Sequence, residues 1–191
     1  MADKVLDGMR VAILLTDDFE QVEMTEPRKA LQEAGAETLL VAPHGGTVQG
    51  VRHREGADKF PVDRTLDEAD SSWFDAVLLP GGALNADALR VEKKAQEIVA
   101  EIDASGRPIA VICHGPWLLV SARLVKGRRL TSYHTIRDDL INAGAEWEDK
   151  EVVRDRNWVS SRSPKDIPAF NRELVSLFAE HWKRVGRRHA A

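Results

Sequence analysis

The stretch Ile109-Ala110-Val111-Ile112-Cys113-His114-Gly115-Pro116-Trp117 decides the fold. Its four leading residues are apolar and rich in β-branched side chains, which predicts a strand of a parallel sheet buried on both faces. A Gly-Pro step ends that strand, and residues 117–122 favour a short buried helix. Cys113, the only cysteine of 191 residues, then lies at a sharp strand-to-helix turn, the geometry of a nucleophile elbow. On this stretch alone, a small buried thiol without chemical function is the more general interpretation, since free cysteines are commonly buried.

The same alternation of apolar runs and helical patterns extends outward over the whole chain. Strands are predicted at residues 10–15, 37–42 and 75–80, helices at 21–34 and 92–104, a small antiparallel excursion within 43–62, a hairpin of 151–154 with 158–161, and a last helix from Ser163-Pro164 onward. Alternating strands and helices predict an α/β fold with a mostly parallel sheet. No linker divides the chain, so we expect one domain over residues 1–191, with a core at about 10–182.

Composition narrows the class of protein. The formal net charge of −4 gives no reason to expect a nucleic-acid partner, and no apolar run is long enough to cross a membrane. A single cysteine cannot form an intrachain disulfide and fits a reducing compartment, and charged residues interrupt any leader-like start, so we expect a cytoplasmic protein. His44, His53 and His134 lack ligand spacing, which indicates no metal site, and no phosphate-binding or dinucleotide motif calls for a cofactor.

Three polar loops follow strands that should end at one edge of the sheet. They are residues 16–20, 81–87 and 113–116. Ligands of open α/β sheets bind at the carboxyl ends of the strands. The candidates for chemistry are therefore expected to converge there through topology, although they are far apart in sequence.

Cysteine attacks carbonyl carbons as a thiolate, which requires a lowered thiol pKa. A helix N-terminus behind Cys113 and a protonated carboxylic acid donating to its sulfur would both help. Glu20 is the candidate acid, because it lies just past the first strand, and it could also shuttle a proton. A solvated carboxylate in an acidic loop is the alternative interpretation of Glu20.

His114 is the candidate general acid or base beside Cys113, although adjacent residues of a turn often point apart. An acting His114 needs an orienting acid, for which Asp87 is the candidate, within the chain or across a subunit interface. The backbone N–H groups of Gly82 and His114 could form an oxyanion hole. A histidine that merely caps the start of the helix is the competing interpretation.

At these residues the chain resembles the ThiJ/PfpI family of intracellular cysteine proteins, within the class I glutamine-amidotransferase-like superfamily. The resemblance is closest to the PfpI branch, intracellular protease I. The matching stretches run in family order from about residue 10 to 180: residues 18–23, 79–82, 112–116, 130–133, 138–147 and 157–162.

The resemblance implies a flavodoxin-like three-layer sandwich with an elbow at Cys113 and contact between Glu20 and the sulfur. Gly81, Gly115 and Tyr133 would surround the catalytic residues. It also implies a homo-oligomer, a dimer or a hexameric assembly of dimers, in which a neighbouring subunit supplies the acid of a Cys-His-acid site. Asp87 matches that acid best, but the family's protease pattern has Glu in a loop one residue shorter.

The resemblance favours a cofactor-free, cysteine-dependent stress-protection enzyme that acts on small carbonyl, glycated or peptide substrates. Deglycase, glutathione-independent glyoxalase and peptidase activities all belong to this architecture. The alternative is a redox-sensing or chaperone-like stress protein with an oxidisable Cys113, because a reactive exposed thiol also oxidises readily.

Overall fold

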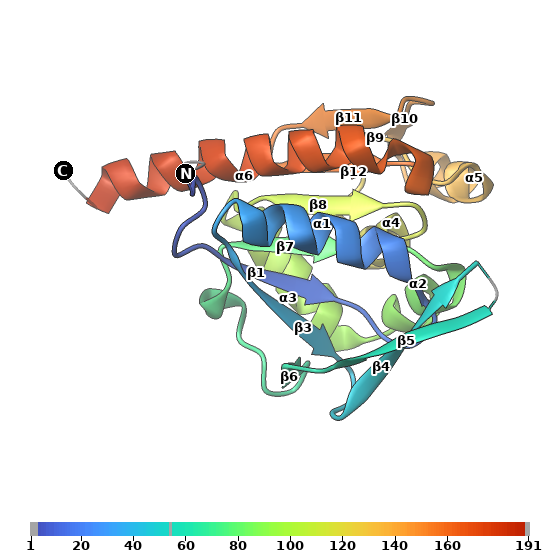
Figure 1. The fold of residues 1–191 in the computed structure, drawn as a ribbon. Helices are drawn as coiled ribbons and strands as arrows, with labels where there is room; N and C mark the ends of the chain where they lie inside the picture. The colour runs from blue at the N-terminus through green and yellow to red at the C-terminus, as the bar shows by residue number, and fades with distance from the viewer. Residues whose placement is uncertain (1–3, 54, 190–191) are drawn as a thin grey trace.

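The computed structural model describes residues 4–53 and 55–189 (Figure 1). Its central sheet comprises β1 (Arg10–Leu14), β3 (Glu37–Ala42), β6 (Arg64–Thr65), β7 (Ala76–Leu79), β8 (Ile109–Ile112), β11 (Val152–Asp155) and β12 (Trp158–Ser161). The strand order is β11-β12-β8-β7-β1-β3-β6. All neighbours pair in parallel except β11 and β12, which form the predicted hairpin.

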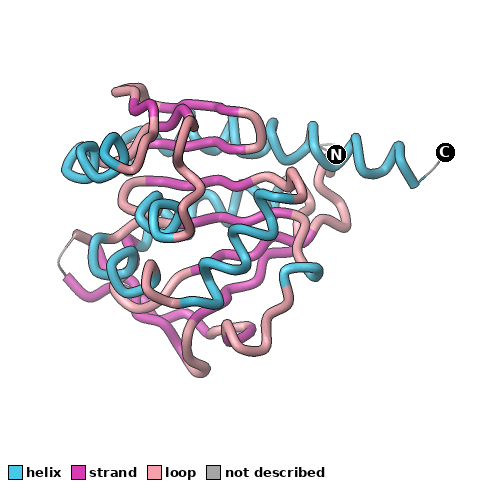
Figure 2. Tube along the Cα trace, turned by 180° about the vertical axis from the view of Figure 1, so that it is seen from behind, coloured by secondary structure: helices cyan, strands magenta, loops and turns pink. Residues whose placement is uncertain are grey.

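Helices cover both faces of this sheet. They are α1 (Gln21–Glu33), α2 (Ala83–Leu89), α3 (Lys93–Ala104), α4 (Pro116–Ser121), α5 (Arg137–Asn142) and α6 (Ile167–His189), with short 3₁₀ turns η1 (Ser71–Trp73), η2 (His134–Ile136) and η3 (Pro164–Asp166). In Figure 1, α1 and α6 lie in front of the sheet, and Figure 2 shows α3 covering the opposite face. The predicted three-layer, flavodoxin-like sandwich is confirmed.

Strand β1 shows why the apolar runs become central strands. Val11 and Ile13 pack in the core beneath α1 and α6, whereas Ala12 and Leu14 pack in the second core beneath α3. Side chains of a strand alternate between faces, so a strand covered on both sides is apolar throughout. Each fully buried Val, Ile or Leu contributes about 1.5–3 kcal/mol, which fixes the register of the strand.

The predicted antiparallel excursion forms a second, smaller sheet. It contains β2 (Phe19–Glu20), β4 (Thr47–Arg52) and β5 (Glu55–Pro61), in which β4 and β5 pair antiparallel. Strand β2 pairs in parallel with β4, so the loop after β1 is fixed to this hairpin. A further difference from expectation is helix α2, which occupies most of the segment predicted as the loop 81–87. The short strands β9 (Arg129–Leu130) and β10 (Glu146–Trp147) pair in parallel as a separate sheet beside α5.

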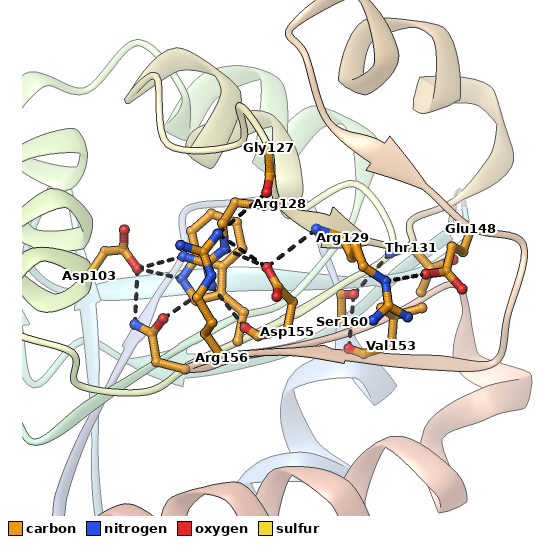
Figure 3. Close-up of polar contacts among 12 residues, drawn as sticks. Asp103, Gly127, Arg128, Arg129, Thr131, Glu148, Val153, Asp155, Arg156 and Ser160 are labelled. Atoms are coloured by element: carbon orange, nitrogen blue, oxygen red, sulfur yellow. Dashed lines mark hydrogen bonds and ion pairs between the residues drawn. The ribbon is translucent and has the colours of Figure 1, made fainter.

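Arg128 connects helix α3 with the β11–β12 hairpin (Figure 3). Arg128 is 4% exposed, and its guanidinium donates to Asp155 at 2.8 Å and to Asp103 at 3.2 Å and lies 3.7 Å above the ring of Trp158. The indole N–H of Trp158 also donates to Asp103 at 2.7 Å. Because Asp103 belongs to α3 and Asp155 to the β11–β12 hairpin, this network holds the helix layer to the last strands.

Within residues 4–53 and 55–189, no helix combines the length and apolarity needed to cross a bilayer.

Candidate active site

Cys113 occupies the turn between β8 and α4. Its backbone has φ of +60°, a left-handed conformation that costs a residue with a side chain about 1–2 kcal/mol. Its N–H donates to the carbonyl of Ser161 and its carbonyl accepts from the N–H of Tyr133, which hold the strained turn in place. The predicted nucleophile elbow is therefore present. Cys113 is 7% exposed, so its sulfur lies at the floor of the site rather than on the surface.

Glu23 is the carboxylic acid that lies against the sulfur. It comes from the first turn of α1, is 0% exposed, and interacts with Cys113 and the N–H of Gly81. Neither carboxyl oxygen makes a hydrogen bond of good geometry to any residue in the described part of the chain. Burial raises the pKa of Glu23 to about 8, the nearby charge of Glu20 acts in the same direction, and the contacts with Cys113 and Gly81 oppose both. Glu23 is thus a protonated acid at neutral pH.

The prediction that Glu20 contacts the sulfur is wrong. Glu20 ends β2, and its carboxylate accepts from the N–H of His53 at 2.9 Å, on the side of the β4–β5 hairpin. It lines a separate groove of about 420 Å³ together with Arg52, His53 and Pro164. One helical turn separates the two acids, and this turn brings Glu23 to the sheet-facing side of α1.

The environment of the sulfur differs from the prediction in a second way. Burial, followed by the charge of Glu23 when ionised, raises the pKa of the Cys113 thiol, whereas the N–H groups of Gly82 and His114 lower it. These are the two backbone donors that we predicted for an oxyanion hole, and both point to the sulfur. The resting form is consequently a thiol, and the expected lowering of its pKa by the turn is outweighed by loss of solvent.

Gly81 and Gly82 allow the elbow and the loop after β7 to approach closely. A Cβ at Gly81 would collide with the carboxyl of Glu23 and with the Cβ of Cys113 at 2.5 Å. Gly82 has φ of +93°, and a Cβ there would lie 2.5 Å from the carbonyl of Asp18. Gly115 is similarly packed against the carbonyl of Leu79. All three predicted glycines therefore lie where a side chain would collide with a neighbouring segment, and their lack of a Cβ lets these segments pack around Cys113.

His114 turns back toward the sulfur of Cys113. Its Nδ1 lies 3.2 Å from the Cys113 sulfur, and its Nε2 lies 3.2 Å from the hydroxyl oxygen of Thr135. The ring stacks on Tyr133, with centroids 5.0 Å apart, and meets the edge of Trp117 at 5.4 Å. Burial first, and then the charge of His134, lower the pKa of His114, so its imidazole is neutral and able to accept a proton.

Asp87 is not brought to His114 within one chain. It lies on the exposed side of α2, and no hydrogen bond or ion pair joins it to another residue of 4–53 or 55–189. The Nε2 that an orienting acid would contact faces Thr135 instead. A contribution of Asp87 to a neighbouring subunit remains a prediction.

Three contributors were missed by sequence reasoning: Glu23, Thr135 and Asn85. Glu23 shares the buried face of α1 with Met24, Pro27 and Leu31, and an acid on an apolar face is a detectable signal. The amide of buried Asn85 donates to the carbonyls of Pro80 and Gly81 and accepts from Thr16, which fixes the glycine loop. Thr135 carried no comparable pattern.

Among the described residues, no group of three or more His, Cys, Asp and Glu side chains is arranged to hold a metal ion.

Comparisons with known proteins point to one family. The model of the DJ-1/PfpI family matches residues 9–177. Deglycase PfpI of Pyrococcus furiosus is 45% identical over 169 residues, which cover 88% of this chain and 99% of that protein. YraA of Bacillus subtilis, named as a presumed cysteine protease, is 41% identical over 168 residues, 88% of this chain and 97% of that one.

A solved structure agrees with these sequence matches. A two-domain protein of Anabaena variabilis, with DJ-1/ThiJ/PfpI-like and ferritin-like domains, superposes with a TM-score of 0.82 at 33% identity. The match covers 88% of this chain and 47% of that protein.

Proposed function

The chain belongs to the DJ-1/PfpI family, and from this premise and the geometry around Cys113 we propose that it is a cofactor-free cysteine-dependent enzyme acting on reactive carbonyl compounds. Deglycation or glyoxalase chemistry is the activity that we favour. One observation carries the proposal: the sulfur of Cys113 lies between a neutral histidine at 3.2 Å and a buried, protonated Glu23. Addition to a substrate carbonyl requires a thiol that attacks the carbon, a base that takes the thiol proton and an acid that can supply a proton.

The first step is addition of the thiol to an aldehyde carbon. The sulfur–carbon bond forms, the thiol proton moves to Nδ1 of His114, and the electrons of the carbonyl become an oxyanion. The N–H groups of Gly82 and His114, which point to the sulfur, are the donors that we assign to this charge. His114 then returns its proton to the oxyanion, which gives a neutral hemithioacetal.

A 2-oxoaldehyde such as methylglyoxal can then rearrange without an external oxidant. Glu23 or His114 moves the proton from C1 to C2, and the hydroxyl proton on the C1 oxygen passes to the C2 oxygen, so that C1 becomes the carbonyl of a thioester and C2 an alcohol. Water hydrolyses the thioester, which releases a 2-hydroxy acid and restores the thiol. The balance is one oxoaldehyde and one water in, and one hydroxy acid out. A neutral Glu23 suits this step because it can donate a proton to one atom while it accepts from another.

The test is turnover of methylglyoxal and of a glycated peptide by the wild type, Cys113→Ala and Glu23→Gln. Cys113→Ala is expected to abolish turnover, and Glu23→Gln to reduce kcat by roughly 10²-fold or more, since a positioned acid or base contributes about 10²–10⁴-fold. Full activity in Cys113→Ala would refute the proposal. Cleavage of unmodified peptides by the wild type, without action on carbonyls, would favour a peptidase instead.

Redox sensing is less favoured by the site. The 7% exposure of Cys113 and its raised thiol pKa both slow oxidation, because peroxide reacts with an accessible thiolate. Mass spectrometry after mild peroxide treatment separates the two functions. Rapid formation of a sulfinic acid with no carbonyl turnover would favour the sensor.

We also propose that the partner of this chain is a second copy of itself. Leu84 and Val91 are 66% and 68% exposed at either end of α2, the helix that carries the exposed Asp87. Large apolar side chains in such positions support burial against another subunit.

A further inference from the structure

The ring of His114 is fully positioned by side chains of its own chain. Nδ1 faces the Cys113 sulfur, Nε2 faces the Thr135 hydroxyl, and Tyr133 and Trp117 pack against the ring. The N–H of Tyr133 donates to the carbonyl of Cys113 at 2.9 Å, so the segment that leads to Thr135 is fixed to the elbow itself. No carboxylate of residues 4–53 or 55–189 is hydrogen-bonded to this imidazole.

We propose that Thr135 is the positioning residue of the site, orienting His114 for proton exchange with Cys113 in the place where an orienting acid is expected. The reacting unit is then Cys113, His114 and Thr135 of one chain. The proposal rests on the proposed function, in which His114 takes the proton of the thiol. It assigns a role to Thr135 and makes Asp87 dispensable for orienting the ring.

A hydroxyl is chemically different from a carboxylate at this position. A neutral imidazole has one donor and one acceptor nitrogen, and a hydroxyl can serve either. When Nε2–H donates to Thr135, Nδ1 is free to accept the thiol proton. When Thr135 donates to Nε2, Nδ1–H faces the sulfur and can stabilise a thiolate. A carboxylate would support only the first tautomer, and its charge would raise the pKa of the imidazole.

The other charged groups near the ring fit a neutral His114. Glu23 lies against the sulfur, and the ring of His134 makes a tilted contact with Tyr133, with centroids 4.5 Å apart. On the opposite side, Asp139 accepts from the indole N–H of Trp117 at 2.8 Å, and Arg90 lies 5.0 Å from the indole ring. A hydroxyl partner adds no charge beside the ring, so His114 stays neutral and can begin the reaction as a base.

Thr135→Val tests the proposal, because valine keeps the shape of threonine and lacks its hydroxyl. Thr135 is exposed, so the variant is expected to fold, which thermal unfolding verifies. We expect kcat for methylglyoxal to fall by about tenfold, part of the roughly 10²–10⁴-fold that a positioned base contributes, with KM little changed. Thr135→Ser should restore the rate. Thr47→Val, at an exposed threonine of β4, is the matched control and should behave as the wild type.

Two readouts need no substrate turnover. The rate of Cys113 alkylation by iodoacetamide is measured against pH, and ¹⁵N NMR of His114 reports its tautomer and pKa. Thr135→Val should slow alkylation and change the tautomer ratio. Thr135→Asp should raise the pKa of His114 by about one unit or more, because an opposite charge favours the imidazolium. The limb of the alkylation profile that reports His114 should move to higher pH accordingly.

The outcomes separate this proposal from the proposed function. If the wild type turns over no carbonyl substrate, yet alkylation and the His114 spectrum depend on Thr135, the function fails and the positioning role stands. If both readouts are the same in the wild type and Thr135→Val, the role of Thr135 is overturned even in an active enzyme. A tenfold loss in Asp87→Asn with a wild-type-like Thr135→Val would overturn it as well and assign the orientation to the acid.

Discussion

Glu23 and Cys113 are two acidic groups buried side by side at the carboxyl edge of the sheet, and burial disfavours the charged form of both. Two neighbouring anions in such a place are unfavourable, so ionisation of one opposes ionisation of the other. Glu23 keeps its proton to a pKa of about 8, and Cys113 keeps its own until a base removes it. In the function that we propose, His114, whose Nδ1 lies 3.2 Å from the sulfur, is this base.

Glu23 also makes stability depend on pH. Its pKa rises from 4.5 to about 8 on folding, so the folded state binds more protons between these values. The stabilisation is therefore fully present below about pH 4.5 and is lost as pH rises through about 8, by up to about 5 kcal/mol at 1.36 kcal/mol per pKa unit. Glu23→Gln, which cannot ionise, should flatten this slope.

Urea unfolding at pH 5.5, 7.0 and 8.5 measures the slope. Glu26→Gln, at an exposed position of the same helix, is the control and should retain the wild-type dependence. Parallel pH profiles for the wild type and Glu23→Gln would show that Glu23 is ionised in the folded chain.

Gly81→Ala tests how tightly the loop after β7 packs against the turn at Cys113. A methyl group there meets both the carboxyl of Glu23 and the Cβ of Cys113, and the strained turn at Cys113 leaves little room to move. Overpacking of this kind costs about 1–3 kcal/mol, and the expected result is a lower Tm together with loss of turnover. Gly56→Ala, at a glycine with open space around it, should change neither. An active and stable Gly81→Ala protein would mean that the loop relaxes freely.

At the level of elements, the sequence was most informative where burial alone determines structure. Strand β8 and the turn at Cys113 were predictable because an apolar run followed by Gly-Pro has few alternative structures. Glu20 was predicted instead of Glu23 although an acid on an apolar helix face is a signal, because the residue at which β2 ends and α1 begins determines which acid faces the sheet. Asn85 was hidden in a segment with a loop-like pattern that folds as α2, since its amide satisfies backbone groups that no local pattern reveals.

The Arg128 network is a second case of contacts that local pattern cannot reveal, and it supports a prediction about stability. Replacing Arg128 by Met leaves Asp103 and Asp155 without their buried cation, and removing one partner of a buried ion pair costs roughly 3–5 kcal/mol. Arg156→Met, at a residue of the same hairpin with a 62% exposed side chain, is expected to change stability by only about 0.5 kcal/mol. Equal urea midpoints for the two variants would contradict a structural role for Arg128.

At the scale of the whole molecule, every group of the candidate site comes from the carboxyl edge of the sheet. Cys113 follows β8, Gly81 follows β7, and Glu23 is reached through β2 after β1. Strands β8, β7 and β1 are neighbours in the central sheet, so residues 90 positions apart in sequence meet at one sulfur. Helix α2 lies beside this edge and exposes Leu84, so a second subunit bound there would lie close to the site.

Self-association therefore has a measurable consequence for both assembly and activity. Light scattering of the purified chain should give a mass of at least a dimer, and Leu84→Glu should shift the equilibrium toward monomer, because a charge cannot be buried unpaired in an apolar contact. Trp73→Gln, at a 45% exposed residue of η1, is the control and should leave the mass unchanged. If Thr135 orients His114 within one chain, the Leu84→Glu monomer should still be alkylated at Cys113 with the wild-type pH profile. A monomeric wild type would refute the assembly, and a monomer with an altered profile would show that the neighbouring subunit completes the site.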